Sequence, residues 1–235
     1  MMQGRTLLVT GASSGIGRAV AERLLAAGAR VVGVARDFSR DPIDRASFET
    51  ELMDLADLDA LPANLKALLR RHPDIDGLVS CAGAGRFGSL EEFSFEQIRA
   101  LLDLNLAAHL QVVRALLPML KRHGFGDIVL LGSENAVHGG PKGAVYAAAK
   151  AGLRGLAQSL RQECASAGVR VTLVNPGMVR TGFFDALHFA PGEDPANFIE
   201  PADVAELIVT VLALRPGTVV DEIDLSPLKR VIRFR

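Results

Sequence analysis

Residues 5–17 read RTLLVTGASSGIG, and this stretch decides the fold of the chain. Its apolar start predicts a buried strand over Arg5–Thr10, and the residues that follow predict a helix over Gly15–Ala27. The glycines between them are spaced Gly-xxx-Gly-x-Gly, and glycine lets a backbone turn sharply and approach a ligand closely. The N-terminus of a helix also attracts anions. The stretch therefore predicts either an ordinary glycine-rich turn or, as we expect, a turn that holds the pyrophosphate of a dinucleotide, with contacts from Gly11, Ser13, Ser14, Gly15, Ile16 and Gly17.

The same order of short apolar run, turn and amphipathic stretch continues along the chain. Further strands are predicted at Arg30–Ala35, Glu51–Leu55, Gly77–Ser80, Asp127–Leu131, Val169–Val174 and Thr218–Leu225. Further helices are predicted at Leu61–Arg71, Phe95–Arg122, Tyr146–Ala167 and Ala202–Leu214. Continuous apolar strands that alternate with helices are typical of a parallel sheet covered on both faces. The sequence thus predicts an α/β fold, a doubly wound, mostly parallel sheet of about seven strands (a Rossmann fold), in a single domain over residues 1–235.

Composition and charge narrow the class of protein. Apolar residues make up 49% of the 235 residues and charged residues 23%, which is enough apolar material for a globular core. The net charge of −1 argues against broad binding to nucleic acid or to an anionic membrane, and no window approaches about 18 uninterrupted apolar residues. The first residues lack the apolar core of a signal peptide. Cys81 and Cys164 match no metal-ligand spacing, so we expect reduced thiols in a cytoplasmic protein that binds no metal.

The only tyrosine of the chain, Tyr146, stands four positions before Lys150, and Ser133 lies upstream of both. On a helix, positions i and i+4 share a face, with Cβ atoms ~5–6 Å apart. An ammonium this close favours the phenolate, and lowering a pKa of ~10 to neutrality takes about 4 kcal/mol. We therefore expect Lys150 to lower the pKa of Tyr146 so that the phenol acts as an acid or base at neutral pH. The alternative is a chance pair on a helix surface.

The end of the second predicted strand indicates which dinucleotide binds. An acid at this position bonds the adenosine ribose hydroxyls in dinucleotide folds, whereas an arginine accommodates a 2′-phosphate. Here Arg36 follows the strand, which favours NADP(H). Asp37 comes next, so NAD(H) is the alternative if the carboxylate faces the ribose instead. After the third predicted strand, Asp54 could accept a bond from the adenine amino group, with Leu55 beside it, or could simply cap a turn.

Taken in order, these motifs resemble the short-chain dehydrogenase/reductase family over essentially the whole chain. The glycine segment resembles the cofactor loop of that family, and Ser133, Tyr146 and Lys150 match its catalytic spacing. Asn105, in the long predicted helix, stands where the family has a fourth catalytic residue. Two further segments, after the fourth and sixth strands, resemble its cofactor wall and supply the remaining expected contacts, which are Ala82, Gly83, Pro176, Gly177, Val179 and Thr181.

The resemblance implies hydride transfer between a nicotinamide cofactor and a carbonyl or secondary alcohol. Tyr146 would exchange a proton with the substrate oxygen, Ser133 would orient that oxygen, and Lys150 would also bind the nicotinamide ribose. Asn105 would hold a water that relays protons to Lys150, unless it is a helix-interior asparagine bonded to the backbone. The resemblance also implies a homodimer or homotetramer that acts on a small molecule, without a nucleic-acid or membrane partner.

Two positions depart from the family pattern. The family carries an asparagine where this chain has Cys81, and a thiol cannot supply amide hydrogen bonds, so this part of the wall is expected to be held differently. Glu134 follows Ser133 in place of a small residue. We expect Glu134 to face solvent; the alternative is a position in the pocket, where it would repel carboxylates or pair with a cation. Several phenylalanines in the expected pocket and lid segments could line an apolar substrate wall or fill the core, namely Phe87, Phe183, Phe184, Phe189 and Phe198.

The substrate and the direction of the reaction are not fixed by the sequence. One rival is a 3-oxoacyl-carrier-protein reductase, which needs a basic patch for its acidic carrier, and Arg154, Arg161 and Arg180 could contribute to one. A rival of another class is an NADP(H)-binding regulator without catalysis, which would need only the cofactor loop. The basic C-terminal segment, residues 229–235, is expected to pack across a subunit boundary or to fray.

Overall fold

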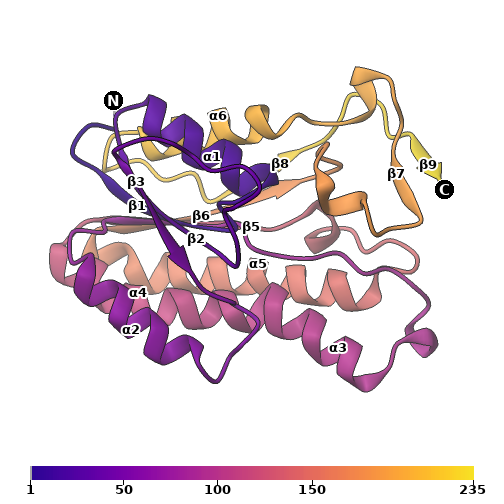
Figure 1. Ribbon diagram of the computed structural model, residues 1–235, viewed down its shortest axis with the longest axis horizontal. Helices are drawn as coiled ribbons and strands as arrows, with labels where there is room; N and C mark the ends of the chain where they lie inside the picture. The colour runs from indigo at the N-terminus through magenta and orange to yellow at the C-terminus, as the bar shows by residue number, and fades with distance from the viewer. Residues whose placement is uncertain (1) are drawn as a thin grey trace.

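Seven parallel strands form the central sheet in residues 2–235, the part of the chain that the computed structural model describes (Figure 1). Residue 1 of the predicted domain lies outside the described residues. The strands are β1 (Thr6–Thr10), β2 (Arg30–Ala35), β3 (Phe48–Leu52), β4 (Gly77–Ser80), β5 (Gly126–Leu131), β6 (Val169–Pro176) and β8 (Glu222–Leu225). Their order, β3-β2-β1-β4-β5-β6-β8, reverses direction between β1 and β4. The predicted doubly wound parallel sheet is confirmed, and folds of this kind bind ligands at the carboxyl ends of the strands where the order reverses.

Helices cover both faces of this sheet (Figure 1). On one face lie α1 (Gly15–Ala26) and α6 (Pro201–Leu212), which contact each other. On the other lie α2 (Leu61–Arg71), α4 (Ala108–His123) and α5 (Ala144–Cys164). Val20 and Ile208 belong to the core cluster of the first face, and Leu65, Val112 and Leu160 belong to that of the second. Because both faces are covered, strands β1, β4, β5 and β6 are buried along their whole length and mostly apolar, which explains why the sequence alone indicated them.

The long predicted helix is continuous but not uniform. α3 (Phe95–Leu102) passes through a π-helical turn, Asp103–Ala107, into α4. Such a turn accommodates an extra residue in the helix and is frequent at functional sites; this one carries the buried Asn105. Within residues 2–235, the helix Phe95–His123 is the one long and apolar enough to cross a membrane, a weak criterion that the core helix of a soluble protein also meets.

The third strand begins earlier than predicted, at Phe48–Leu52 rather than at Glu51–Leu55. It is the edge strand of the sheet and most of its side chains are exposed or half-buried, so its apolar pattern is weak. Phe48 is buried, and its ring lies 2.6 Å from where a Cβ on Gly33 of β2 would be. The fit of this ring onto the glycine favours the observed register.

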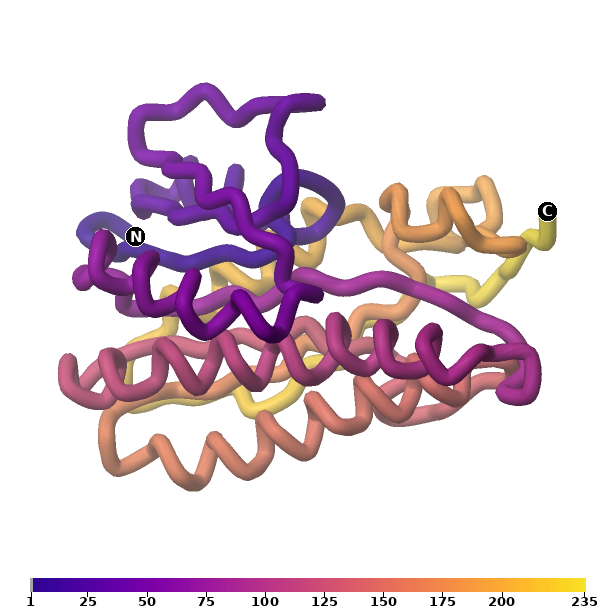
Figure 2. Tube along the Cα trace, turned by 60° about the horizontal axis from the view of Figure 1, so that its bottom comes forward, coloured from indigo at the N-terminus to yellow at the C-terminus, as the bar shows by residue number. Residues whose placement is uncertain are grey.

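A second sheet of two strands forms near the C-terminus (Figures 1 and 2). In it β7 (Phe189–Pro191) pairs antiparallel with β9 (Ile232–Phe234), so that Phe189 lies opposite Phe234. The backbone N–H of Arg235 also donates to the carbonyl of His188, at 2.8 Å. Figure 2 shows this segment at the end of the molecule away from the N-terminus. The basic C-terminal segment therefore packs on its own chain instead of fraying, a pairing that its short, charged sequence did not indicate.

Candidate active site

The four residues predicted to be catalytic lie close together at the carboxyl end of the sheet. Ser133 follows β5, while Tyr146 and Lys150 lie one turn apart on α5. All three are buried, and Asn105 is fully buried. The Nζ atom of Lys150 lies 5.7 Å from the centre of the Tyr146 ring. A Cβ added to Gly83 would lie 2.8 Å from Asn105 Oδ1 and 3.8 Å from Lys150 Nζ. Asn105 and Lys150 therefore lie on either side of the loop after β4, close to each other.

Ser133 is held in place by Asn175, a residue that the sequence analysis did not single out. The backbone N–H of Ser133 donates to Asn175 Oδ1 at 3.2 Å. The amide of Asn175 donates in turn to Glu222, at 2.7 Å, and to Asp224, at 2.9 Å. Asn175 is fully buried in β6, and both acids belong to β8. The end of β5 is thus fixed by side chains of β6 and β8, and the signal in the sequence is the amide that stands next to last in the buried strand β6.

Burial controls the charge state of the tyrosine and the lysine. It raises the pKa of Tyr146 to about 12, with the adjacent Ser133 hydroxyl acting in the opposite direction. Burial also lowers the pKa of Lys150 to about 8. The Lys150 ammonium donates to the carbonyl of Leu131 at 2.9 Å. Burial thus raises the pKa of Tyr146, whereas the spacing in the sequence predicted that Lys150 would lower it.

Asn105 makes hydrogen bonds only to backbone groups in the described residues. Its amide donates to the carbonyls of Leu101, at 2.9 Å, and of Ala84, at 3.0 Å. Its Oδ1 accepts from the N–H of Ala84 at 3.2 Å. The structure therefore agrees with the alternative of a backbone-bonded asparagine, and its position next to Gly83 keeps it beside Lys150.

The glycine loop has the shape and polarity of a phosphate site. A Cβ on Gly17 would lie 2.3 Å from the carbonyl oxygen of Gly11, so only glycine fits there. α1 begins at Gly15, and the side chain of its N-cap residue, Ser14, makes no capping bond within residues 2–235. The first turn of α1 carries no acid. Exposed N–H groups at an uncapped helix N-terminus fit a pyrophosphate, so this loop suits the predicted cofactor.

The wall after β6 lies across this loop. A Cβ on Gly15 would lie 3.3 Å from the methyl group of Thr181, so Thr181 borders the glycine loop. Gly177 follows Pro176, the last residue of β6, and a Cβ on it would lie 3.0 Å from Glu134 Oε2. Val179, by contrast, is buried in the core.

At the predicted adenosine end, the two candidate side chains differ in how they are engaged. The carboxylate of Asp37 accepts from the N–H of Ser39, at 2.7 Å, and from its hydroxyl, at 3.0 Å; the backbone bond is the main reason that the pKa of Asp37 is lowered. Arg36 is exposed, and its side chain has no partner among residues 2–235. The carboxylate of Asp37 is thus hydrogen-bonded within its own turn, whereas the guanidinium of Arg36 is available to a ligand.

The residues after the third strand fit the prediction less well. Asp54 lies two positions beyond β3, and its carboxylate accepts from the N–H of Ala56 at 2.9 Å, as in the turn cap that the sequence left open. Leu55 is buried in the core cluster beneath α2 and α4, so its side chain is committed to packing.

Aromatic rings lie against Tyr146. The ring centre of Tyr146 lies 5.2 Å from that of Phe87 and 6.0 Å from that of Phe183. Phe87 also lies 5.1 Å from Phe189 of β7, and Phe184 lies 5.9 Å from Phe189. These four phenylalanines form an aromatic wall beside Tyr146, in which Phe184 is buried and the other three are half-buried, whereas Phe198 stacks on Arg180 outside the wall, at 4.4 Å.

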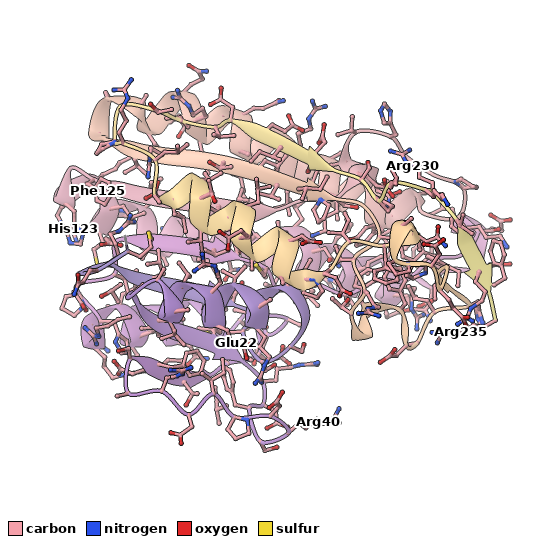
Figure 3. The ribbon with its side chains drawn as sticks, turned by 90° about the horizontal axis from the view of Figure 1, so that it is seen from above. Glu22, Arg40, His123, Phe125, Arg230 and Arg235 are labelled. Carbon is pink, nitrogen blue, oxygen red and sulfur yellow. The ribbon has the colours of Figure 1, made fainter. Side chains whose placement is uncertain are left out.

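Glu134 faces solvent only in part, since its side chain is 32% exposed. Its Oε2 atom is buried and has no hydrogen-bond partner within residues 2–235. The nearest cation is Arg230 of the C-terminal segment, at 3.7 Å. Figure 3 shows Arg230 on the same side of the molecule as the C-terminal Arg235. No group of three potential metal ligands is found in the described part of the chain.

This chain is similar to known oxidoreductases along most of its length. Residues 5–189 match the family described as short chain dehydrogenase. The chain is 31% identical over 228 residues to an uncharacterised oxidoreductase of Staphylococcus epidermidis, covering 95% of this chain and 97% of that protein. It is 34% identical over 190 residues to a 3-oxoacyl-[acyl-carrier-protein] reductase of Escherichia coli, covering 79% and 78%. Its fold is similar to that of an alcohol dehydrogenase from the archaeon Thermococcus sibiricus in complex with 5-hydroxy-NADP, with a TM-score of 0.86, 27% identity and coverage of 97% and 98%.

Proposed function

The chain belongs to the short-chain dehydrogenase family and is an oxidoreductase, and from this premise we propose that it transfers a hydride between NADP(H) and a carbonyl or secondary-alcohol substrate. The observation that carries the proposal is the buried group of Ser133, Tyr146 and Lys150 beside a glycine loop shaped for a pyrophosphate. A regulator that only binds the cofactor would have no need to bury these three polar side chains, since burial of an ammonium and a phenol is costly.

In this proposal the bound nicotinamide gives or takes the hydride, and the chain handles the proton. Tyr146, with a pKa of about 12, is protonated at neutral pH and can donate its proton to the substrate oxygen during reduction. Ser133 donates to the same oxygen and orients it. Lys150, with a pKa of about 8, is mostly charged at pH 7, so it can donate to ribose hydroxyls. In the reverse direction its charge would stabilise the phenolate form of Tyr146, which accepts the proton of the alcohol. Asn105 holds the loop next to Lys150 by its bonds to Ala84.

The preference for NADP(H) is supported by the side chains at the end of β2. Arg36 is exposed and free to meet a 2′-phosphate, while Asp37 is occupied by Ser39. The similar alcohol dehydrogenase from Thermococcus sibiricus was solved with an NADP derivative. NAD(H) is the alternative if Asp37 leaves Ser39 for the ribose. A comparison of KM for NADPH and NADH decides between them, and a strong preference for NADH would contradict the proposal.

The substrate proposed is a small apolar carbonyl compound or alcohol. The rings of Phe87 and Phe183 lie against Tyr146, and Phe189 packs on Phe87, so an apolar substrate would meet aromatic side chains there. We also propose a cytoplasmic enzyme made of one domain. Phe95, which is 87% exposed on α3, supports a homodimer or homotetramer built on the long helix.

The rival reaction, reduction of 3-oxoacyl groups on a carrier protein, is favoured by the relative in Escherichia coli. It is disfavoured by the arginines that would form the carrier patch. Arg154 pairs with Glu222 at 2.8 Å, Arg161 pairs with Asp221 at 2.7 Å, and Arg180 pairs with Glu200. Acids thus neutralise each candidate cation.

The deciding experiment is a substrate panel followed at 340 nm with NADPH and with NADH. We expect turnover of small apolar ketones or aldehydes to exceed that of an acetoacetyl thioester. The opposite order would favour the carrier-protein reductase. Tight NADPH binding without oxidation across the panel would instead support a non-catalytic regulator.

A further inference from the structure

The loop after β4 is the part of the cofactor wall where Cys81 stands in place of an amide. Two backbone N–H groups of this loop, those of Cys81 and Ala82, donate to the Thr10 hydroxyl at 3.1 and 3.2 Å. The carbonyl of Ala82 is bonded by His109 Nε2 at 2.9 Å. The other ring nitrogen of His109 lies 2.7 Å from the hydroxyl of Ser80. The peptide groups of the loop are therefore bound by side chains from β1 and α4, and none of these bonds involves the Cys81 thiol.

The direction of each hydrogen bond in this chain can be assigned. A carbonyl only accepts, so Nε2 of His109 must carry the hydrogen that points at Ala82. Burial, aided by the charge of Lys150, lowers the pKa of His109 to about 3, so the ring is neutral and its Nδ1 accepts from Ser80. The Ser80 oxygen, at 3.5 Å from that of Thr10, is then left to accept from the Thr10 hydroxyl. Thr10, Ser80 and His109 are each at most 2% exposed, so water does not compete.

His109 and Asn105 act on neighbouring parts of the same loop. They stand four positions apart, Asn105 in the π turn and His109 at the start of α4. Asn105 binds both backbone groups of Ala84, and His109 binds the carbonyl of Ala82. Gly83 stands between Ala82 and Ala84 and lies next to Lys150. On the other side, the Cα atom of Ala82 lies 3.1 Å from where a Cβ on Gly11 of the glycine loop would be. The loop so held separates the glycine loop from the lysine.

We propose that His109 is a positioning residue for the cofactor: through its bonds to Ala82 and Ser80 it fixes the wall at Gly83, in place of the amide that Cys81 does not supply. The inference rests on the proposed function, because it assumes that a dinucleotide lies against this wall. A purely structural role would make His109 one more buried, hydrogen-bonded side chain, with no special effect on cofactor affinity.

The test compares three substitutions in the full chain. His109→Leu removes both ring bonds, and His109→Gln keeps a donor that can reach the Ala82 carbonyl. His72→Leu is the matched control, since His72 is also buried and its Nε2 bonds a side chain, Glu51, at 3.2 Å, but it lies at the end of α2. The dissociation constant for NADPH is measured from the fluorescence of the reduced nicotinamide, and stability from the midpoint of thermal unfolding.

We expect His109→Leu to weaken NADPH binding at least tenfold and His109→Gln to stay within about threefold of the wild type. His72→Leu should lower the midpoint without changing the dissociation constant. Amide exchange of residues 82–84, measured without cofactor, should accelerate in His109→Leu only. Should His109→Leu fail to fold, Ser80→Ala takes its place, with a smaller but measurable loss of NADPH affinity expected.

Two negative results have different meanings. If the wild type binds neither NADPH nor NADH, the proposed function fails and this inference fails with it. If the wild type binds NADPH, but His109→Leu binds it equally well and loses only stability, as His72→Leu does, the positioning role is refuted and the proposed function stands.

Discussion

Replacing Lys150 by methionine tests the electrostatics of the site without knowledge of the substrate. Lys150 is 3% exposed, and burial lowers its pKa from 10.5 to about 8. The unfolded chain therefore binds this proton more tightly than the folded protein, and the folded state is destabilised wherever the lysine is charged. The penalty is absent above pH ~10.5, grows as the pH falls through this window, and is complete below pH ~8.

The size of the effect follows from these pKa values. One pKa unit corresponds to ~1.4 kcal/mol, so the buried ammonium costs on the order of 3 kcal/mol of folding free energy at pH 7. At pH 9.5 part of this cost is relieved, so the free energy of unfolding of the wild type should be ~2 kcal/mol higher than at pH 7 from Lys150 alone. Methionine has a similar length and no charge. It also leaves the Leu131 carbonyl without the bond from Lys150, which costs ~1–3 kcal/mol. Lys150→Met should therefore be about as stable as the wild type at pH 7, or up to ~2 kcal/mol more stable, although it loses turnover.

The assay is urea unfolding at pH 7 and pH 9.5, with free energies extrapolated to water. Other groups that titrate in this range are common to both proteins, so the comparison isolates Lys150. The stability of the variant relative to the wild type should fall by ~2 kcal/mol as the pH rises from 7 to 9.5, because only the wild type gains stability from Lys150. An equal pH dependence in the two proteins would show that Lys150 is not a buried, charged ammonium, and the reasoning about the site would be refuted.

Three other substitutions or deletions test separate parts of the site. Tyr146→Phe should lower kcat by ~10²–10⁴ with NADPH affinity nearly unchanged, as measured at 340 nm and by fluorescence titration; wild-type turnover would mean that the proton comes from elsewhere. Arg36→Ala should raise KM for NADPH about tenfold and leave KM for NADH unchanged. Arg40 is also exposed and serves as the control, since Arg40→Ala should change neither KM. Equal effects of the two substitutions would contradict the assignment of Arg36 to the 2′-phosphate. Deletion of residues 229–235 removes β9, the strand that pairs with Phe189 of the aromatic wall. KM for an apolar substrate should therefore rise, while the dissociation constant for NADPH stays the same. An unchanged KM would mean that β9 does not hold the aromatic wall in place.

The sequence predicted those features that depend on residues near one another in the chain. The alternation of apolar runs and amphipathic helices indicated the parallel sheet, because strands covered on both faces must be apolar throughout. The glycine spacing indicated the turn before α1, because Gly17 stands against the carbonyl of Gly11, a few residues away. The spacing of Tyr146 and Lys150 indicated a shared helix face, because both lie on α5.

Tertiary structure decided what depends on contacts between distant segments. The register of β3 depends on how Phe48 packs on Gly33, and the fold-back of β9 depends on its pairing with β7. The raised pKa of Tyr146 comes from burial, which no local spacing reveals. The same holds for the loop at Cys81, where Thr10, Ser80 and His109 meet only after the strands have assembled. A side chain's neighbours in the sequence fix its local geometry, whereas its solvation and its hydrogen-bond partners are set by whichever parts of the chain fold around it.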